Sequence, residues 1–565
     1  MKRKIDDEQM LLSEMSIDRM KDNLQTIAKW KRHTGTEEEL KAFRFVESKL
    51  QEYGLEDIKI YMPELYISLP VRTEFSVEGK NLHSITHSFS VSTPEAGIYA
   101  DMVVYKPGRS RYDGKVVLIC DRANPDYVEE AENRGAIAEV FASDGLMRYD
   151  IVSKVWGAPT PETVDYLPHT PTLTISEKDR DMLLKKLEKG PVNVNIKTEV
   201  NTQWVQSPQL EARLTGNSYP DEYVLVSSHL CSWEYGAIDN ASANAVLMEI
   251  ANLLSKRKQQ LTRSIRFVFW SGHTHGPYAG SAWYADTFWY DLHKNCVAHI
   301  NIESTGPAGT EGYEAIAMAE ARKFAEIIIK EATGEKPVYR RMTYDSDESF
   351  MSMGVTSIFN MTSRYKSKRE NKFILGWHHH TDEDLPERID DEQYRKDASI
   401  FVKSIWRLVA LDRVLPYDFK AVVDEITQRI KYLNEISNGL LGLEKVAVQL
   451  NKMKTLLIEF EKKKVGATDD EILRINKTLI QLGRKISPVN CSITGPYEHD
   501  LQEVDRPPIP SLTPLEYLVK MDKHTLEYRT ILTKLIHNRN WLMDSIDMAC
   551  ETLENFLRDS KSFSE

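Results

Sequence analysis

The sequence has no long hydrophobic run and no strong excess of either charge. No apolar stretch approaches the roughly 18 residues that a membrane-spanning helix requires. The formal net charge is -12 over 565 residues, which is modest for this length and argues against a nucleic acid or an anionic membrane surface as partner. The basic residues that follow Met1 lack the apolar segment of a secretory signal. We therefore expect no membrane partner, no nucleic-acid partner and no secretory signal.

Cysteine is scarce and scattered. The five cysteines form no Cys-x-x-Cys pair, which argues against a structural zinc ribbon. Their odd number and wide spacing fit a reduced protein better than a disulfide framework. We therefore expect a cytoplasmic protein, with free cysteines at positions 120, 231, 296, 491 and 550.

The hydrophobic pattern divides the chain into three parts. Apolar residues recur at helical spacing over residues 8–53, and short alternating strands punctuated by glycine and proline dominate residues 70–200. Charged, heptad-like helices follow residue 412. Thr36 and Thr468 are each followed by a glutamate three residues later, which predicts two capping boxes, and Pro514 is expected to open one final helix. We predict an α/β core of residues 1–68 and 200–413, a β-rich insert of residues 69–199, and a helical region of residues 414–565.

One stretch carries polar residues at the end of a predicted buried strand. The apolar run 223–226 predicts this strand, which delivers His229 at its C-terminal end. Asp239 lies where the following loop enters a helix that begins near Ala241. Ligands of α/β sheets bind outside the carboxyl ends of the strands. An imidazole and a carboxylate at such a place can be two ligands of one metal ion, although one histidine and one aspartate by themselves more often have ordinary structural roles.

Later segments carry a family resemblance that strengthens the metal interpretation. With the stretch around His229, residues 264–281, 299–306 and 376–390 resemble the metal-binding segments of peptidase family M28, a group of zinc aminopeptidases that includes glutamate carboxypeptidase and the transferrin receptor. Residues 346–355 resemble a strand entry that this family writes as Ser-Asp-His-x-x-Phe. Order and spacing agree over residues 205–410.

The resemblance implies a fold and an assembly. The fold would be α/β, with an M28-type mixed β-sheet flanked by helices. Residues 113–141 resemble the protease-associated domain that many members carry as an insert, which walls the substrate cleft without chemistry of its own. The C-terminal helices resemble, in kind only, the dimerisation domain of glutamate carboxypeptidase. A homodimer is therefore expected, and a monomeric bundle that caps the core is the alternative.

The resemblance also implies a cofactor, Zn²⁺, as one or two ions, with another divalent metal as an alternative. The family holds a zinc pair through a histidine, a bridging aspartate, a glutamate, an aspartate or glutamate, and a final histidine. His229, Asp239, Glu303 and His380 match the first, second, fourth and last of these positions.

The second metal segment departs from the family pattern. The family has two consecutive glutamates here, a general base and a metal ligand, whereas this chain has Gly272-His-Thr-His-Gly. We favour His273 as the replacement ligand and His275 as the base or a supporting donor, because a neutral imidazole can bind zinc or accept a proton. The opposite register stays open, and so does the loss of the second metal position.

Two further positions differ from the family. Cys231 stands where the family has an aspartate that accepts a hydrogen bond from the first ligating imidazole. We interpret it as a small buried residue, with a softer metal environment as the alternative. His379 stands where the family often has a tyrosine that stabilises the oxyanion, and an imidazole can donate a hydrogen bond there.

These residues predict a metal-dependent hydrolase in which activated water attacks an amide or peptide bond. The altered segment favours a small peptide or amide, or a modified amino acid, over ordinary peptide turnover. The alternative is a catalytically inactive M28-fold binding protein, of the kind that the transferrin receptor represents. Loss of both glutamates favours that alternative, whereas retention of four ligand-type residues favours the enzyme.

Overall fold

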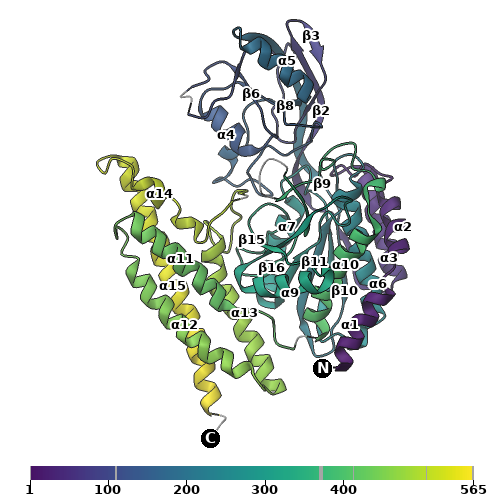
Figure 1. Ribbon diagram of the computed structural model, residues 1–565, viewed down its shortest axis with the longest axis vertical. Coiled ribbons are helices and arrows are strands. Elements are labelled where there is room, and N and C mark those ends of the chain that lie inside the picture. Colours follow the sequence, from purple (N-terminus) through teal and green to yellow (C-terminus); the bar gives the residue numbers. More distant parts are fainter. Residues whose placement is uncertain (1, 109–110, 368–372, 412, 504, 563–565) are drawn as a thin grey trace.

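The chain forms three parts, arranged around a central β-sheet (Figure 1). The structure is a computed structural model that describes residues 2–108, 111–367, 373–411, 413–503 and 505–562. In the view of Figure 1 the β-rich insert stands above the central part, and the C-terminal helices lie beside it. None of the described helices is both long enough and apolar enough to span a bilayer. The mixed α/β architecture with a helical C-terminal region confirms the predicted fold class.

The central sheet has ten strands, in the order β1-β10-β12-β11-β13-β16-β14-β17-β18, with β15 paired to β14. β11 pairs in parallel with both β12 and β13, so the carboxyl ends of these three strands lie on one edge. The strands are β1 Glu56–Tyr61, β10 Gln209–Leu214, β11 Tyr219–His229, β12 Arg263–Trp270, β13 Cys296–Asn301, β14 Gly312–Ala317, β15 Val338–Arg341, β16 Ser357–Ile358, β17 Ser363–Lys366 and β18 Phe373–Ile374.

Helices cover both faces of this sheet, which explains the uninterrupted apolar run 223–226 of its middle strand β11. On β11, Val224 and Val226 belong to the main core, which also contains α6, whereas Tyr223 and Leu225 pack on the opposite side with α7 and α8. The helices of this part are α1 Lys2–Glu14, α2 Ile17–Ile27, α3 Glu37–Glu52, α6 Ala243–Ser255, α7 Ala279–Thr287, α8 Trp289–Asn295, α9 Arg322–Thr333 and α10 Asp391–Trp406.

The capping box predicted at Thr36 forms only in part. The Thr36 side chain accepts a hydrogen bond from the backbone N–H of Glu39, as expected. The Glu39 carboxylate does not return to Thr36. It accepts hydrogen bonds from the backbone N–H of Gly35 at 2.7 Å and from the Ser271 hydroxyl at 2.5 Å. Because Glu39 is fully buried, a tertiary contact takes the place of the local one.

The insert contains a second sheet of eight strands, in the order β3-β2-β9-β5-β6-β7-β8-β4. Its strands and helices are β2 Glu64–Val77, β3 Lys80–Leu82, β4 Ser84–Thr86, β5 Ile98–Val104, β6 Val116–Ile119, α4 Pro125–Asn133, β7 Ala138–Phe141, β8 Thr172–Ile175, α5 Glu177–Leu187 and β9 Val192–Gln206. β2 and β9 pair along their lengths, from Glu64 opposite Gln206 to Val77 opposite Val194. The base of this ribbon, at Leu65 and Ile67, packs on Ala279 of α7 and joins the insert to the central part.

The C-terminal region is helical, with its helices packed on one another. It contains α11 Phe419–Ile436, α12 Glu444–Lys464, α13 Asp469–Cys491, α14 Leu515–Leu518 and α15 Leu526–Ser562. The capping box predicted at Thr468 is confirmed, because the Thr468 side chain bonds the Glu471 backbone while the Glu471 carboxylate bonds the backbone N–H of Thr468.

The single final helix predicted from Pro514 onward is wrong. The structure ends α14 at Leu518 and begins α15 at Leu526. Asp522 bends the chain between them, because its carboxylate accepts the backbone N–H of His524 and its carbonyl accepts that of Thr525. The Thr525 hydroxyl then accepts the backbone N–H of Tyr528 and starts the new helix. Short polar side chains commonly offer the backbone such local alternatives to helix.

Candidate metal centre

Three parallel strands end on one edge of the central sheet, and each has a candidate metal ligand at its end or a few residues beyond it. His229 is the last residue of β11, His273 follows β12 closely, and Glu303 follows β13 closely. This edge is where α/β proteins bind ligands, because loops and side chains converge there. The His229 and Glu303 side chains are buried at this edge.

Six side chains form two clusters at this edge. The first cluster consists of His229, His273 and Glu303, and the second consists of Asp239, His379 and His380. Within each cluster, ligand-type atoms lie within 4.8 Å of one another.

Asp239 joins the two clusters. Its Oδ1 lies 3.0 Å from His229 Nε2, and its Oδ2 lies 3.1 Å from His380 Nε2. One carboxylate therefore presents one oxygen toward each cluster, which is the arrangement that a bridging metal ligand requires.

Two buried atoms in this arrangement fit a divalent cation. Among the described residues, His229 Nε2 and Asp239 Oδ1 have no hydrogen-bond partner, although they face each other. Buried polar atoms are normally hydrogen-bonded. The other ring nitrogen of His229, Nδ1, donates to the Cys231 carbonyl oxygen at 3.0 Å, so Nε2 is the nitrogen left to face Asp239 and to bind a metal ion in place of a proton. Protein ligands bind zinc tetrahedrally at about 2.0–2.2 Å, which places two ligand atoms of one ion about 3.3–3.6 Å apart, a few tenths of an ångström more than this pair shows.

The electrostatics of this pair also fit a cation. Burial alone would lower the pKa of His229, but the adjacent Asp239 carboxylate raises it well above its usual value. Burial alone would raise the pKa of Asp239, but His379, His229 and His380 hold it well below its usual range. The pair therefore attracts a positive charge, and a proton and a metal ion would compete for the same place.

Supporting hydrogen bonds orient the rest of the first cluster. Asp347 Oδ2 accepts from His273 Nδ1 at 2.9 Å, which leaves Nε2 as the lone-pair nitrogen. Burial raises the pKa of Asp347, but the His273 imidazole outweighs burial and lowers it. The Ser346 hydroxyl donates to Glu303 Oε2. Burial raises the pKa of Glu303, and His273 and His229 oppose that rise.

Two residues that the sequence analysis gave no role hold the loop of the site. Both Asp384 oxygens accept backbone N–H groups, from Ile238 at 2.8 Å and from Asp239 at 2.9 Å. Arg32 is fully buried and donates to the carbonyls of Leu230, Tyr235 and Gly236, among others. The sequence spacing between His380 and Asp384 could have pointed to Asp384. No local pattern marks Arg32 for this role, because its partners in the loop of the site lie about two hundred positions away.

His275 lies outside both clusters, within the part of the chain that the structure describes. Its Nδ1 lies 3.3 Å from the Thr34 hydroxyl, and its ring packs against Trp233 and His33. Burial lowers its pKa well below the usual value, so the ring is neutral.

Two positions that differ from the family pattern take clear places. His379 belongs to the second cluster, with Nδ1 3.7 Å from Asp239 Oδ2 and its ring stacked on His380. The Cys231 carbonyl supplies the acceptor for His229 that an aspartate would otherwise provide. The thiol accepts from the Thr274 hydroxyl at 3.0 Å. Burial raises the pKa of this thiol, but the His229 imidazole outweighs burial and lowers it to about 7. Cys231 therefore supports His229 through its backbone.

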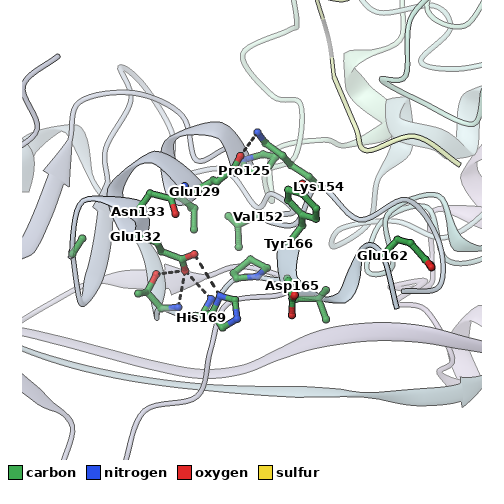
Figure 2. A pocket seen from close by; sticks show the side chains of 15 residues that line it. Pro125, Glu129, Glu132, Asn133, Val152, Lys154, Glu162, Asp165, Tyr166 and His169 are labelled. Carbon is green, nitrogen blue, oxygen red and sulfur yellow. Dashed lines mark hydrogen bonds and ion pairs between the residues drawn. The ribbon is translucent and has the colours of Figure 1, made fainter. Parts of the chain in front are cut away.

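A cavity of about 650 Å³ lies in the insert, beside α4 and the chain around residues 162–170 (Figure 2). Figure 2 shows Glu129 bonded to Lys154 and Glu132 beside His169 on its wall. The cavity shares no described residue with the two clusters, so it is a separate feature of the molecule.

Comparison with known proteins shows which proteins the core of this chain is similar to. Residues 210–405, which contain both clusters, match the model of peptidase family M28. Carboxypeptidase Q of Xenopus laevis is 24% identical over 421 residues, covering 68% of this chain and 84% of that protein. Carboxypeptidase Q of Homo sapiens is 27% identical over 306 residues, covering 49% and 62%.

Solved structures agree on the fold. BSAP, a zinc aminopeptidase from Bacillus subtilis, superimposes with a TM-score of 0.56 at 18% identity, covering 72% of this chain and 98% of that chain. An aminopeptidase from Aneurinibacillus sp. strain AM-1 gives a TM-score of 0.54 at 19% identity, covering 71% and 96%. At this level of identity the likeness shows the shared fold.

Proposed function

We propose that this chain, an M28-family zinc peptidase-like protein, is a hydrolase that cleaves a small peptide or amide at the two clusters joined by Asp239. The match of residues 210–405 to a metallopeptidase family, and the likeness to carboxypeptidase Q, support a metal-dependent hydrolase in general. The observation that carries the finer proposal is the buried, mutually facing pair of His229 Nε2 and Asp239 Oδ1.

The chain's own residues have distinct tasks in this proposal. His229, His273 and Glu303 would hold one zinc ion, His379 and His380 would hold a second, and Asp239 would bridge them. Bound zinc lowers the pKa of water and polarises a carbonyl group. Asp347, Ser346 and the Cys231 carbonyl fix the orientation of the first cluster through the hydrogen bonds described above.

Two glutamates of the family pattern are missing after β12, and this affects both the metal ligands and the expected rate of turnover. His273 takes the place of a carboxylate ligand, because the hydrogen bond to Asp347 occupies its Nδ1 and leaves Nε2 as the nitrogen that would bind zinc. A role for His275 as proton acceptor, and for His379 as a donor to the oxyanion, stays a prediction. We propose slow turnover of ordinary peptides, because no glutamate base follows β12.

Metal content and turnover together test this function. Protein purified without affinity histidines is analysed for metal per chain, then assayed on dipeptides and aminoacyl amides before and after chelation and zinc return. We expect about two zinc ions per chain and zinc-dependent hydrolysis. Asp239→Asn should lose metal and activity, whereas His169→Ala, at an exposed histidine of the insert, should keep both.

Three outcomes separate the alternatives. Metal binding with zinc-dependent turnover supports the hydrolase. Metal binding without turnover of any amide favours the binding-protein alternative. Failure of the wild-type chain to bind zinc after reconstitution contradicts the proposed centre itself.

A further inference from the structure

The insert reaches the second cluster through one backbone segment. The backbone N–H of Tyr149 donates to the His380 carbonyl at 2.9 Å, and the Tyr149 carbonyl oxygen lies 2.8 Å from His380 Nδ1. Arg148 donates to the His379 carbonyl at 3.3 Å, and the Tyr149 ring stacks on Trp233. Both histidines of the second cluster are therefore fastened to the insert.

An ion pair of the insert, formed by Asp150 and Arg122, contacts the Nδ1 atom of His380. Asp150 Oδ1 lies 3.3 Å from His380 Nδ1, and the Asp150 side chain is only 7% exposed. Arg122, which follows β6, holds Asp150 through its Nε at 2.8 and 3.0 Å from the two carboxylate oxygens. The pair is thereby neutralised inside the protein, as buried charges require.

These contacts determine which ring nitrogen of His380 is free. The Tyr149 carbonyl and the Asp150 carboxylate are both acceptors, so His380 Nδ1 carries the proton. Arg122 Nη2 also lies 2.9 Å from this nitrogen, but it has the Asp150 carboxylate as an acceptor. His380 Nε2 is then the lone-pair atom, and it lies 3.1 Å from Asp239 Oδ2.

We propose that Asp150 and Arg122 are positioning residues for His380, so that the insert completes the metal centre of the core. The inference rests on the proposed metal site, and it goes beyond a wall for the substrate cleft. Groups that hold the second nitrogen of a ligating histidine fix its tautomer and ring orientation, and they contribute strongly to metal affinity. Here those groups come from another part of the chain than the ligands.

Zinc affinity is the direct test. We compare the wild type with Asp150→Asn and with the double variant Asp150→Asn/Arg122→Gln, which removes both charges and avoids leaving the partly buried Arg122 without its carboxylate. Asp101→Asn is the matched control, because Asp101 forms an ion pair with Lys115 at 2.9 Å on β5 of the same insert, away from the clusters. Competition with a chromogenic chelator measures both zinc affinities, and the visible spectrum of the cobalt-substituted protein reports ligand geometry.

The expected result is selective. Asp150→Asn and the double variant should each weaken one zinc site about 10- to 100-fold and leave the other unchanged. The cobalt spectrum should change, and thermal unfolding of the metal-free double variant should match that of the wild type. Asp101→Asn should change none of these.

The inference and the proposed function fail in different ways. If the wild type binds zinc and the double variant binds it equally well at both sites, the inference is overturned and the metal centre stands. If both sites weaken equally in step with lower stability of the metal-free protein, the pair is only structural and the inference is overturned. If the wild type binds no zinc, the proposed centre fails and the inference fails with it.

Discussion

At the scale of single residues, the two histidines that follow β12 lie in different surroundings, and only one of them belongs to a metal cluster. His273 points into the first cluster, with its Nδ1 bonded to Asp347, whereas His275 faces Thr34 behind Trp233. The two rings are separated in sequence by Thr274 alone. Their different surroundings explain why sequence spacing left the register open.

We predict that His273→Ala lowers the zinc content by about one ion per chain, because it removes a ligand nitrogen from the first cluster. His275→Ala serves as the matched control and should keep the wild-type zinc content. Elemental analysis of both variants after exhaustive dialysis measures this difference. Loss only in His275→Ala would show that the register is the reverse, and equal metal content in the two variants would contradict His273 as the ligand.

A second residue-scale prediction concerns Glu139 of the insert. Burial raises its pKa to about 8, although the Thr170 hydroxyl opposes the shift through a hydrogen bond of 2.6 Å. In the unfolded chain this carboxyl ionises near pH 4. The contribution of Glu139 to the free energy of unfolding is therefore fully present below about pH 4. It is lost as the pH rises toward 8, which lowers the free energy of unfolding by about 3–5 kcal/mol in total.

Replacement of Glu139 by glutamine should remove this pH dependence. Glu139→Gln should match the wild type near pH 5 and unfold at a higher temperature near pH 8.5. Thermal unfolding followed by circular dichroism at both pH values measures the effect. A variant that is equally destabilised at both values would contradict a protonated Glu139 in the folded insert.

At the scale of elements, the close packing of α7 against β12 positions the first cluster. A Cβ atom added to Gly280 of α7 would lie 2.1 Å from the Ser271 carbonyl oxygen and 2.5 Å from Gln209 Oε1. Ser271 immediately precedes the turn that presents His273. A glycine is therefore required here because backbone approaches backbone.

We predict that Gly280→Ala destabilises the protein by about 1–3 kcal/mol, the usual cost of overpacking. The added methyl group should also push the turn after β12 out of place, which should weaken zinc binding at the first cluster. Chemical denaturation and chelator competition measure the two effects. Wild-type stability together with wild-type affinity would show that α7 can move away from β12 without disturbing the site.

At the scale of the whole molecule, the C-terminal helices lie beside the core (Figure 1). α12 carries exposed apolar side chains at Val448 and Ile458, and Val465 is exposed just after its end. Exposed apolar groups of this kind favour association, although single ones are common on protein surfaces. A homodimer and a cytoplasmic location therefore stay predictions, and the first can be measured directly.

We predict that this chain forms a dimer in solution, and that the double substitution Val448→Asp/Ile458→Asp shifts it toward the monomer. Light scattering during size-exclusion chromatography gives the mass. Val164→Asp, at an exposed apolar residue of the insert, is the control and should leave the mass unchanged. A wild-type mass equal to one chain at micromolar concentration would contradict the dimer.

The sequence by itself determined the elements and the candidate residues. Periodicity predicts the strand that ends at His229 and the helices of both ends, because burial of one face repeats with the period of the element. Family spacing singled out the ligand-type residues, and the structure brings His229, His273, Glu303, Asp239, His379 and His380 into two joined clusters. Local reasoning failed where distant groups compete, as at Glu39, which bonds Ser271 instead of closing its own capping box.

Only the tertiary structure decided how these residues are held. Arg32 and Asp384 reach the loop of the site from remote parts of the chain, and Asp150 of the insert stands behind His380 of the core. Such contacts depend on the relative placement of whole elements, which no repeat or spacing in the chain encodes. The ligand types are thus a property of the sequence, whereas their tautomers and orientation arise from packing between its parts.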